Sequence, residues 1–154
     1  METTFFMIKP EGLIHAEDIF TDLLLYNMNI VLKKEIIMSC DLMKGIYKNQ
    51  SGKFFEANRD YLVGKKCILL IIEGHNVAER LYKLSGDNYN PSCCEIGTLR
   101  RKYGIHEPIL HPNGRQLFLN AVHRSTPENS ANEVSLILEY LGASCIIKSV
   151  DVEN

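Results

Sequence analysis

Two short and almost entirely apolar runs constrain the fold of this chain more than any other feature. They are Thr3–Ile8 (TTFFMI), which stops at a Lys-Pro-Glu-Gly segment, and Cys67–Ile72 (CILLII). Apolar runs of this length that are bounded by turn residues are typical of buried β-strands. The sequence therefore predicts at least two strands inside a hydrophobic core.

Periodicity and turn residues predict the other elements. A further strand is expected at Asn29–Met38, and Ser144–Val150 is expected to form an edge strand or a tail. The order of the elements suggests a ferredoxin-like α/β sandwich, with an antiparallel sheet of three or four strands and helices packed on one face. Helical spacing and capping residues predict helices over 16–26, 41–47, 53–62, 76–84, 98–103 and 128–141.

Composition excludes several classes of protein. The chain has 154 residues, 45% hydrophobic and 23% charged, which indicates one domain spanning residues 1–154. A formal charge of -2 gives no general attraction for nucleic acid or anionic lipid. Five cysteines, an odd number, do not suit a disulfide framework and favour a cytoplasmic location. No window approaches the roughly 20 apolar residues of a membrane span, so neither secretion nor membrane insertion is expected.

The segment 104–118 (GIHEPILHPNGRQLF) is unusually long for a connection between elements. It contains two prolines and a Pro-Asn-Gly turn, and it shows no helical or strand period. Connections of this length in a compact domain are usually functional or disordered. We therefore expect an extended loop here.

The segment Asn120–Val134 (NAVHRSTPENSANEV) is the strongest candidate for a catalytic site. His123 follows an apolar pair and precedes Ser125 and Thr126, whose hydroxyls can cap a helix or bond to the ring. A neutral imidazole nitrogen is a good nucleophile when a carboxylate or carbonyl orients the other nitrogen. Glu133 is the nearest carboxylate with sufficient reach. The alternative is a hydrogen-bonded structural histidine.

A phosphoryl-transfer site also requires positive charge around the phosphate oxygens. Lys9, Arg100 and Arg124 carry that charge, and the alternative for each is a solvated surface side chain. The pair Phe54-Phe55 has two interpretations as well. Both rings belong to the core, or one of them stacks on a nucleobase.

Five segments, in order, resemble the nucleoside diphosphate kinase family. The first, TFFMIKPEG, is similar to that family's Thr-Phe-x-x-Ile-Lys-Pro-Asp-Gly. The last, NAVHRSTPENSANEV, is similar to its Asn-x-x-His-Gly-Ser-Asp, which carries the phosphorylated histidine. Between them lie KFF, IEGHNVAERLYKLSGDNYNP and GTLRRKYG. The resemblance covers nearly the whole chain.

The resemblance implies a ping-pong transfer of a γ-phosphoryl group from a nucleoside triphosphate to a histidine and then to a nucleoside diphosphate. It implies Mg²⁺ held by the nucleotide phosphates, without direct protein ligands, and a homo-oligomer, either a hexamer or a tetramer. The roles it implies are His123 as nucleophile, Glu133 orienting the imidazole, Lys9 and Asn120 on the sugar hydroxyl side, Arg100 on phosphate, Phe54 stacked on the base, Tyr47 as the active-site tyrosine and Ser125 as the serine near the nucleophile.

Three positions depart from the family pattern close to this chemistry. Arg124 and Thr126 stand where the family has glycine and aspartate, and Tyr82 stands where it has a second phosphate-binding arginine. Loss of that arginine removes a charge-assisted contact worth roughly 1.5 to 3 kcal/mol. We expect Arg124, or Arg115 at the Pro-Asn-Gly-Arg turn of the long loop, to supply positive charge to the phosphate instead.

Two functions therefore remain open at this point. One is a nucleoside diphosphate kinase with an altered phosphate clamp, acting on nucleoside di- and triphosphates. The other is a nucleotide-binding module of the same fold with weak or lost turnover, acting as a regulator or partner. The joint presence of the lysine, the asparagine, one arginine and the histidine favours the enzyme.

Overall fold

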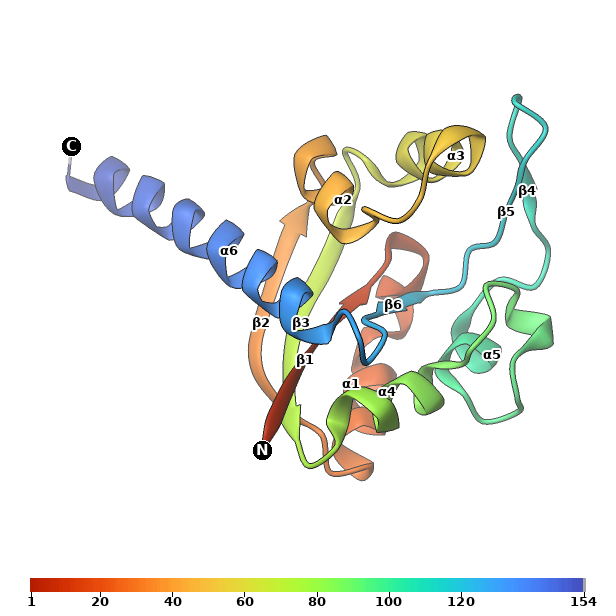
Figure 1. Cartoon of the computed structure of the whole chain (residues 1–154), viewed down its shortest axis with the longest axis horizontal. Helices are drawn as coiled ribbons and strands as arrows, with labels where there is room; N and C mark the ends of the chain where they lie inside the picture. Colours follow the sequence, from red (N-terminus) through yellow and green to blue (C-terminus); the bar gives the residue numbers. More distant parts are fainter. Residues whose placement is uncertain (154) are drawn as a thin grey trace.

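The core of the protein is a four-stranded antiparallel sheet with the strand order β2-β3-β1-β6 (Figure 1). The computed structural model describes the backbone of residues 1–153 and the side chains of residues 1–142. The predicted ferredoxin-like α/β fold is confirmed. The strands are β1 (Glu2–Ile8), β2 (Asn29–Ile37), β3 (Lys66–Gly74) and β6 (Val122–Arg124).

Helices cover both faces of this sheet, so the expectation of helices on one face was wrong. Because successive side chains of a strand point to opposite faces, Phe5 and Met7 of β1 pack on one side and Phe6 and Ile8 on the other. All four are fully buried. A central strand with consecutive buried apolar residues requires cover on both faces, and Leu69–Ile72 of β3 have the same character.

The two helical layers come from different parts of the chain. The layer over Phe5 and Met7 contains α2 (Cys40–Ile46), α3 (Gly52–Leu62) and α6 (Ser130–Glu153). The opposite layer contains α1 (Ala16–Leu25), α4 (Val77–Ser85) and α5 (Leu99–Tyr103). Two 3₁₀ helices, η1 (Pro10–His15) and η2 (Pro91–Cys93), begin at prolines. Within the described residues, no helix has the length and apolar character needed to cross a membrane.

The fourth strand is β6, and not the segment 144–150 that we expected at an edge or as a tail. That segment continues α6, which runs to Glu153. After Leu141 the helix meets a single glycine and no proline, so no residue ends it strongly. The strand β6 pairs with the end of β1, where Met7 lies opposite His123. His123 therefore lies on a sheet edge and not at a helix entrance.

The segment expected as an extended loop contains a short β-hairpin. Its strands are β4 (Ile109–Leu110) and β5 (Gln116–Leu117), which pair antiparallel. The turn between them contains Gly114 with a φ of 91°, a conformation that favours glycine. Figure 1 shows the hairpin beside α3, and residues of β5 contact α3.

A close backbone approach joins the end of β1 to the start of β6. A Cβ atom on Gly12 would lie 2.5 Å from the carbonyl oxygen of Ala121. The same oxygen accepts a hydrogen bond of 2.9 Å from the Lys9 N–H. Ala121 has a φ of 72°, which costs a non-glycine residue free energy and persists only where neighbours enforce it. The absence of a side chain at residue 12 therefore helps to set where β6 begins.

We predict that Gly12→Ala destabilises the fold by about 1 to 3 kcal/mol, because the new methyl group overlaps a backbone oxygen that is itself held in place. Thermal unfolding measures this change. Gly142→Ala is the control, since it adds a methyl group in open space on α6 and should stabilise by about 0.5 to 1 kcal/mol. Equal unfolding temperatures for Gly12→Ala and the unmodified chain would contradict the packing argument.

Candidate functional site

A cavity opens at the sheet edge formed by β6, between the two helical layers. It is bounded by the ends of β1 and β6, by α2, α3 and α6, and by β5 of the hairpin. Three of the eleven residues predicted from sequence, Tyr82, Ser125 and Arg115, do not line it. The other eight do, and they are Lys9, Tyr47, Phe54, Arg100, Asn120, His123, Arg124 and Glu133.

His123 is held at the cavity wall by one strong hydrogen bond. Its Nε2 lies 2.8 Å from Oε1 of Glu133, and no described residue bonds to Nδ1. Its ring packs against Tyr47 and Phe5, with ring centroids 5.1 and 5.6 Å away. Burial lowers the pKa of His123 below its usual 6.5, the carboxylate of Glu133 opposes this, and Arg100 reinforces it. The imidazole is therefore held neutral with one nitrogen free.

The start of α6 brings Glu133 to His123. The Ser130 hydroxyl donates to Thr4 Oγ1 at 2.7 Å, which fixes the first turn of α6 against β1. Glu133 is in the first turn of α6, where a carboxylate is also stabilised by the helix dipole. This docking brings the first turn of α6 to the strand edge that carries His123.

Arg100 and Arg124 form a buried pair of cations in the cavity wall, only 3% and 9% exposed. Arg100 donates to the carbonyl oxygens of Val122 at 3.2 Å and of Asn88 at 3.1 Å. Burial, and next the charge of Arg124, lower the pKa of Arg100 to about 10. Arg124 donates to the Gly86 carbonyl at 3.2 Å, while its buried Nε has no partner among the described residues. The pair has donors left for an anion.

Tyr82 supports Arg124 and lies outside the cavity lining. The Cζ atom of Arg124 lies 4.1 Å from the centroid of the Tyr82 ring, a cation–π distance. The two cations of α4 do not line the cavity either. Lys83 pairs with Glu79, and Arg80 donates to the carbonyl oxygens of His75 and Tyr26. The Arg124 guanidinium therefore packs on the Tyr82 ring.

Lys9 and Asn120 meet at the bottom of the cavity. Lys9 Nζ donates to Asn120 Oδ1 at 3.1 Å. Burial lowers the pKa of Lys9, and the neighbouring Glu11 carboxylate opposes that effect. Glu11 lies 3.6 Å from Lys9 and accepts a hydrogen bond from the Ala121 N–H at 3.0 Å. Sequence reasoning missed Glu11, although its place in the Lys-Pro-Glu-Gly segment after β1 was the available signal.

The two adjacent phenylalanines of α3 lie in different environments, which matches the alternative of one core ring and one ring available for a ligand. Phe55 packs against the core beneath α2 and α6, while Phe54 lines the cavity. Arg115 does not line the cavity. Its Cζ lies 5.0 Å from the centroid of the Phe54 ring, because the hairpin that carries it is attached to α3. Leu117 of β5 also lines the cavity.

The two hydroxyls after Arg124 are buried and have no hydrogen-bond partner among the described residues. Thr126 lines the cavity, and Ser125 lies behind it. Unpaired buried hydroxyls are costly. They leave additional donors beside the two arginines.

The cavity has no set of protein ligands suited to a metal ion. Glu133, the carboxylate that lines it, is engaged by His123, and the neighbouring Glu11 is engaged by Ala121 and Tyr61. Across the part of the chain that the structure describes, the only group of three candidate ligands lies outside the cavity lining.

Solved structures share this fold. A nucleoside diphosphate kinase of Borrelia burgdorferi, described as a transition-state mimic with bound vanadate and ADP, gives a TM-score of 0.76 at 19% identity, over 88% of this chain and 85% of that one. The Halobacterium salinarum enzyme in complex with CDP gives 0.73 at 23% identity, over 88% of this chain and 86% of that one.

Sequence comparison adds relatives of higher identity. A nucleoside diphosphate kinase of Methanosphaera stadtmanae is 30% identical over 142 residues, covering 90% of this chain and 86% of that protein. One from Saccharolobus islandicus is 30% identical over 116 residues, covering 72% and 83%. The profile of the family described as "Nucleoside diphosphate kinase" matches residues 2–140. Together with the fold, this match shows that the chain belongs to the nucleoside diphosphate kinase family.

Proposed function

We propose that this chain is an active nucleoside diphosphate kinase that transfers a γ-phosphoryl group through a phosphohistidine on His123. The observation that carries the proposal is the 2.8 Å contact between His123 Nε2 and Glu133 in a cavity that also contains two buried arginines. A purely structural histidine has no need of a neighbouring pair of desolvated cations.

The geometry supports Nδ1 of His123 as the nucleophile. With Glu133 ionised, the imidazole proton lies on Nε2 and is donated to the carboxylate, which leaves the Nδ1 lone pair free. Nδ1 attacks the γ-phosphorus, the bond between that phosphorus and the β,γ-bridging oxygen breaks, and the nucleoside diphosphate leaves. Glu133 stabilises the positive charge that develops on the ring. In the second half-reaction a terminal oxygen of another nucleoside diphosphate attacks the same phosphorus, the bond between phosphorus and Nδ1 breaks, and neutral His123 is regenerated.

The cations of the cavity stabilise charge on the transferring group. Arg100 and Arg124 are oriented before the ligand arrives, so little reorganisation is needed at the moment of transfer. Lys9 adds a third cation, 3.1 Å from Asn120 Oδ1, and in our proposal this pair contacts the sugar hydroxyl side. Mg²⁺, bound through the nucleotide phosphates, supplies further neutralisation of their charge.

The remaining residues orient the nucleotide and the nucleophile. Phe54 stacks on the base, a contact that every base can make. Tyr47 packs on His123 and keeps its phenol protonated, since burial raises its pKa. Ser125 is the serine near the nucleophile, two residues after His123. It is buried and does not line the cavity itself. A homo-oligomer, hexameric or tetrameric, and a cytoplasmic location stay predictions of the sequence.

The second candidate is a nucleotide-binding module whose turnover is weak or lost. Tyr82 in place of the family's arginine favours it, because a charge is missing at that position. Both candidates bind nucleotides, and only the kinase forms a phosphoenzyme.

We predict that γ-labelled ATP labels the protein, that the label survives base and is lost in acid, and that added CDP removes it as CTP. His123→Ala should abolish labelling and exchange. The matched control is His75→Ala, at the opposite end of the sheet beside the Glu2 end of β1, which should keep both. Binding of ADP without any labelling of the unmodified chain would favour the non-catalytic module.

We predict that Arg124→Gly lowers the rate of phosphoenzyme formation about 10- to 100-fold, through loss of a charge-assisted contact. Adding Tyr82→Arg to that variant restores the family pattern at both positions and should recover most of the rate. Lys83→Ala removes a charge from the same face of the sheet without affecting the cavity and serves as control. A double variant no faster than Arg124→Gly would show that an arginine at residue 82 cannot replace the arginine at residue 124.

We predict that the imidazole of His123 titrates below 6.5, because burial and the two arginines oppose its protonation. Labelling should therefore persist as the pH falls below 6.5, and decline only through the lower folded-state pKa. The unfolded chain binds this proton more tightly than the folded chain. The free energy of unfolding should therefore decrease as the pH is lowered from 6.5 toward the folded-state pKa. NMR titration, assigned with His123→Gln, measures the pKa directly. Glu133→Gln should lower it further, and a value above 6.5 would contradict the electrostatics.

A further inference from the structure

The β4–β5 hairpin is attached to α3 on both sides of Phe54. His111 Nε2 lies 2.8 Å from Asp60 Oδ2, and Asn113 Nδ2 donates to the Lys53 carbonyl oxygen at 2.9 Å. Lys53 precedes Phe54 in α3, and Asp60 lies further along the same helix. The hairpin is therefore fixed relative to the ring that lines the cavity.

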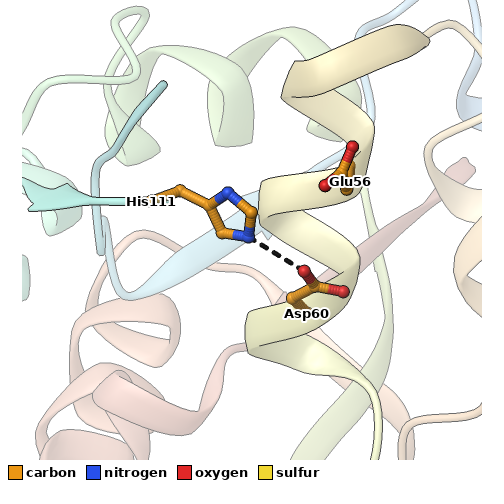
Figure 2. Close-up of side chains that lie close together, drawn as sticks. All are labelled: Glu56, Asp60 and His111. Carbon is orange, nitrogen blue, oxygen red and sulfur yellow. Dashed lines mark hydrogen bonds and ion pairs between the residues drawn. The ribbon is translucent and has the colours of Figure 1, made fainter. Parts of the chain in front are cut away.

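His111 acts as an anchor and not as a metal ligand. Figure 2 shows its imidazole directed at Asp60, with Glu56 on the next turn of α3, and candidate ligand atoms of the three lie within 4.8 Å of one another. However, the backbone N–H of Asn113 donates to His111 Nδ1 at 3.0 Å. Since a backbone N–H can only donate, the imidazole proton is on Nε2, which donates to Asp60. No lone pair is left there for a cation.

The anchored hairpin places Arg115 next to the Phe54 ring, just outside the cavity lining. Arg115 precedes β5, and its carbonyl oxygen accepts a hydrogen bond of 2.8 Å from the His111 N–H across the hairpin. Leu117 lies two residues further along, so the two side chains point to the same side. Leu117 lines the cavity together with Phe54, and the Arg115 guanidinium lies 5.0 Å from the Phe54 ring centroid. A base stacked on Phe54 would therefore have Leu117 near it on the inside and Arg115 at its outer edge.

The donors of Arg115 are free for a ligand. Among the described residues its guanidinium forms no ion pair and no hydrogen bond, whereas Arg59 bonds to Asp60 and Arg101 to the Ser92 carbonyl. A guanidinium has only donors, and its fork matches two adjacent acceptors. Guanine presents such a pair in O6 and N7, while adenine presents N7 beside an amino group that is itself a donor.

We propose that Arg115 is a specificity-determining residue that makes this site prefer guanine over adenine nucleotides. The inference rests on the proposed stacking of the base on Phe54. When a base enters, the guanidinium exchanges its contact with the Phe54 ring for the edge of the base. The hairpin anchors, His111 and Asp60, are positioning residues for Arg115.

Binding of GDP and ADP, each with Mg²⁺, to the unphosphorylated full chain tests this without any need for turnover. Calorimetry should give an affinity for GDP about tenfold above that for ADP, as one bidentate contact to guanine provides. Arg115→Ala should bring the ratio close to one. Arg115→Lys should do nearly the same, because an ammonium keeps the charge without the fork. Lys34→Ala, an exposed cation on the opposite edge strand β2, should keep the tenfold ratio.

Asp60→Ala should also lower the ratio, since it releases the hairpin, and an unchanged ratio would overturn the positioning role of the anchor. Equal affinities of the unmodified chain for GDP and ADP, or a preference that survives Arg115→Ala, would overturn the proposal while leaving the kinase function standing. Failure of the chain to bind either nucleotide would overturn both, and labelling by ATP separates the two cases independently.

Discussion

The buried carboxylate of Glu11 organises the parts of the chain that meet at the site. Its side chain is only 2% exposed, and it accepts hydrogen bonds from the Tyr61 hydroxyl and the Ala121 N–H, each at 3.0 Å. Lys9 supplies the nearest positive charge. A buried carboxylate is tolerated only when it is paired and hydrogen-bonded, so these partners are held as firmly as Glu11 itself. They come from α3, the approach to β6 and the end of β1, and Glu11 itself belongs to η1.

This arrangement explains how a three-residue strand can place two unlike side chains at one cavity. The strained Ala121 is held by Glu11 on its N–H and by Lys9 on its carbonyl oxygen. From there β6 alternates, so His123 points to the face of Phe5 and Arg124 to the opposite face. Because β6 is an edge strand with no outer neighbour, a cavity at that edge reaches both. The nucleophile and the phosphate-binding cation that we propose are therefore consecutive residues.

The sequence predicted the elements whose signals are local and missed those that depend on distant partners. The apolar runs of β1 and β3 are visible without any tertiary information. The strand β6 is not, since Val122–Arg124 is too short to show a period and exists because β1 offers an unpaired edge. Likewise α6 passes Leu141 because a single glycine does not stop it, whereas the sequence suggested an edge strand or a tail after this point.

The candidate site divides in the same way. Motif resemblance identified His123, Glu133 and Arg100 by residue type, and the structure brings these three together. The position of Arg115 was beyond reach, because it depends on the pairing of His111 with Asp60, fifty-one positions apart in the chain. Glu11 was overlooked because a carboxylate beside a lysine is usually a surface ion pair, and only the fold shows that it is buried.

The arginine pair is the physical basis of the phosphate site that we propose. Arg100 and Arg124 are both withdrawn from water, each disfavours the charge of the other, and both donate to the same Gly86 carbonyl. Carbonyl dipoles offset only part of the cost of burying two like charges. An anionic group between them replaces that repulsion with attraction and also reaches the unpaired Nε of Arg124. The repulsion between the two buried guanidinium groups lowers the stability of the unliganded fold. In our proposal a bound phosphate removes this repulsion, so the same interaction that destabilises the free protein increases its affinity for a phosphoryl group.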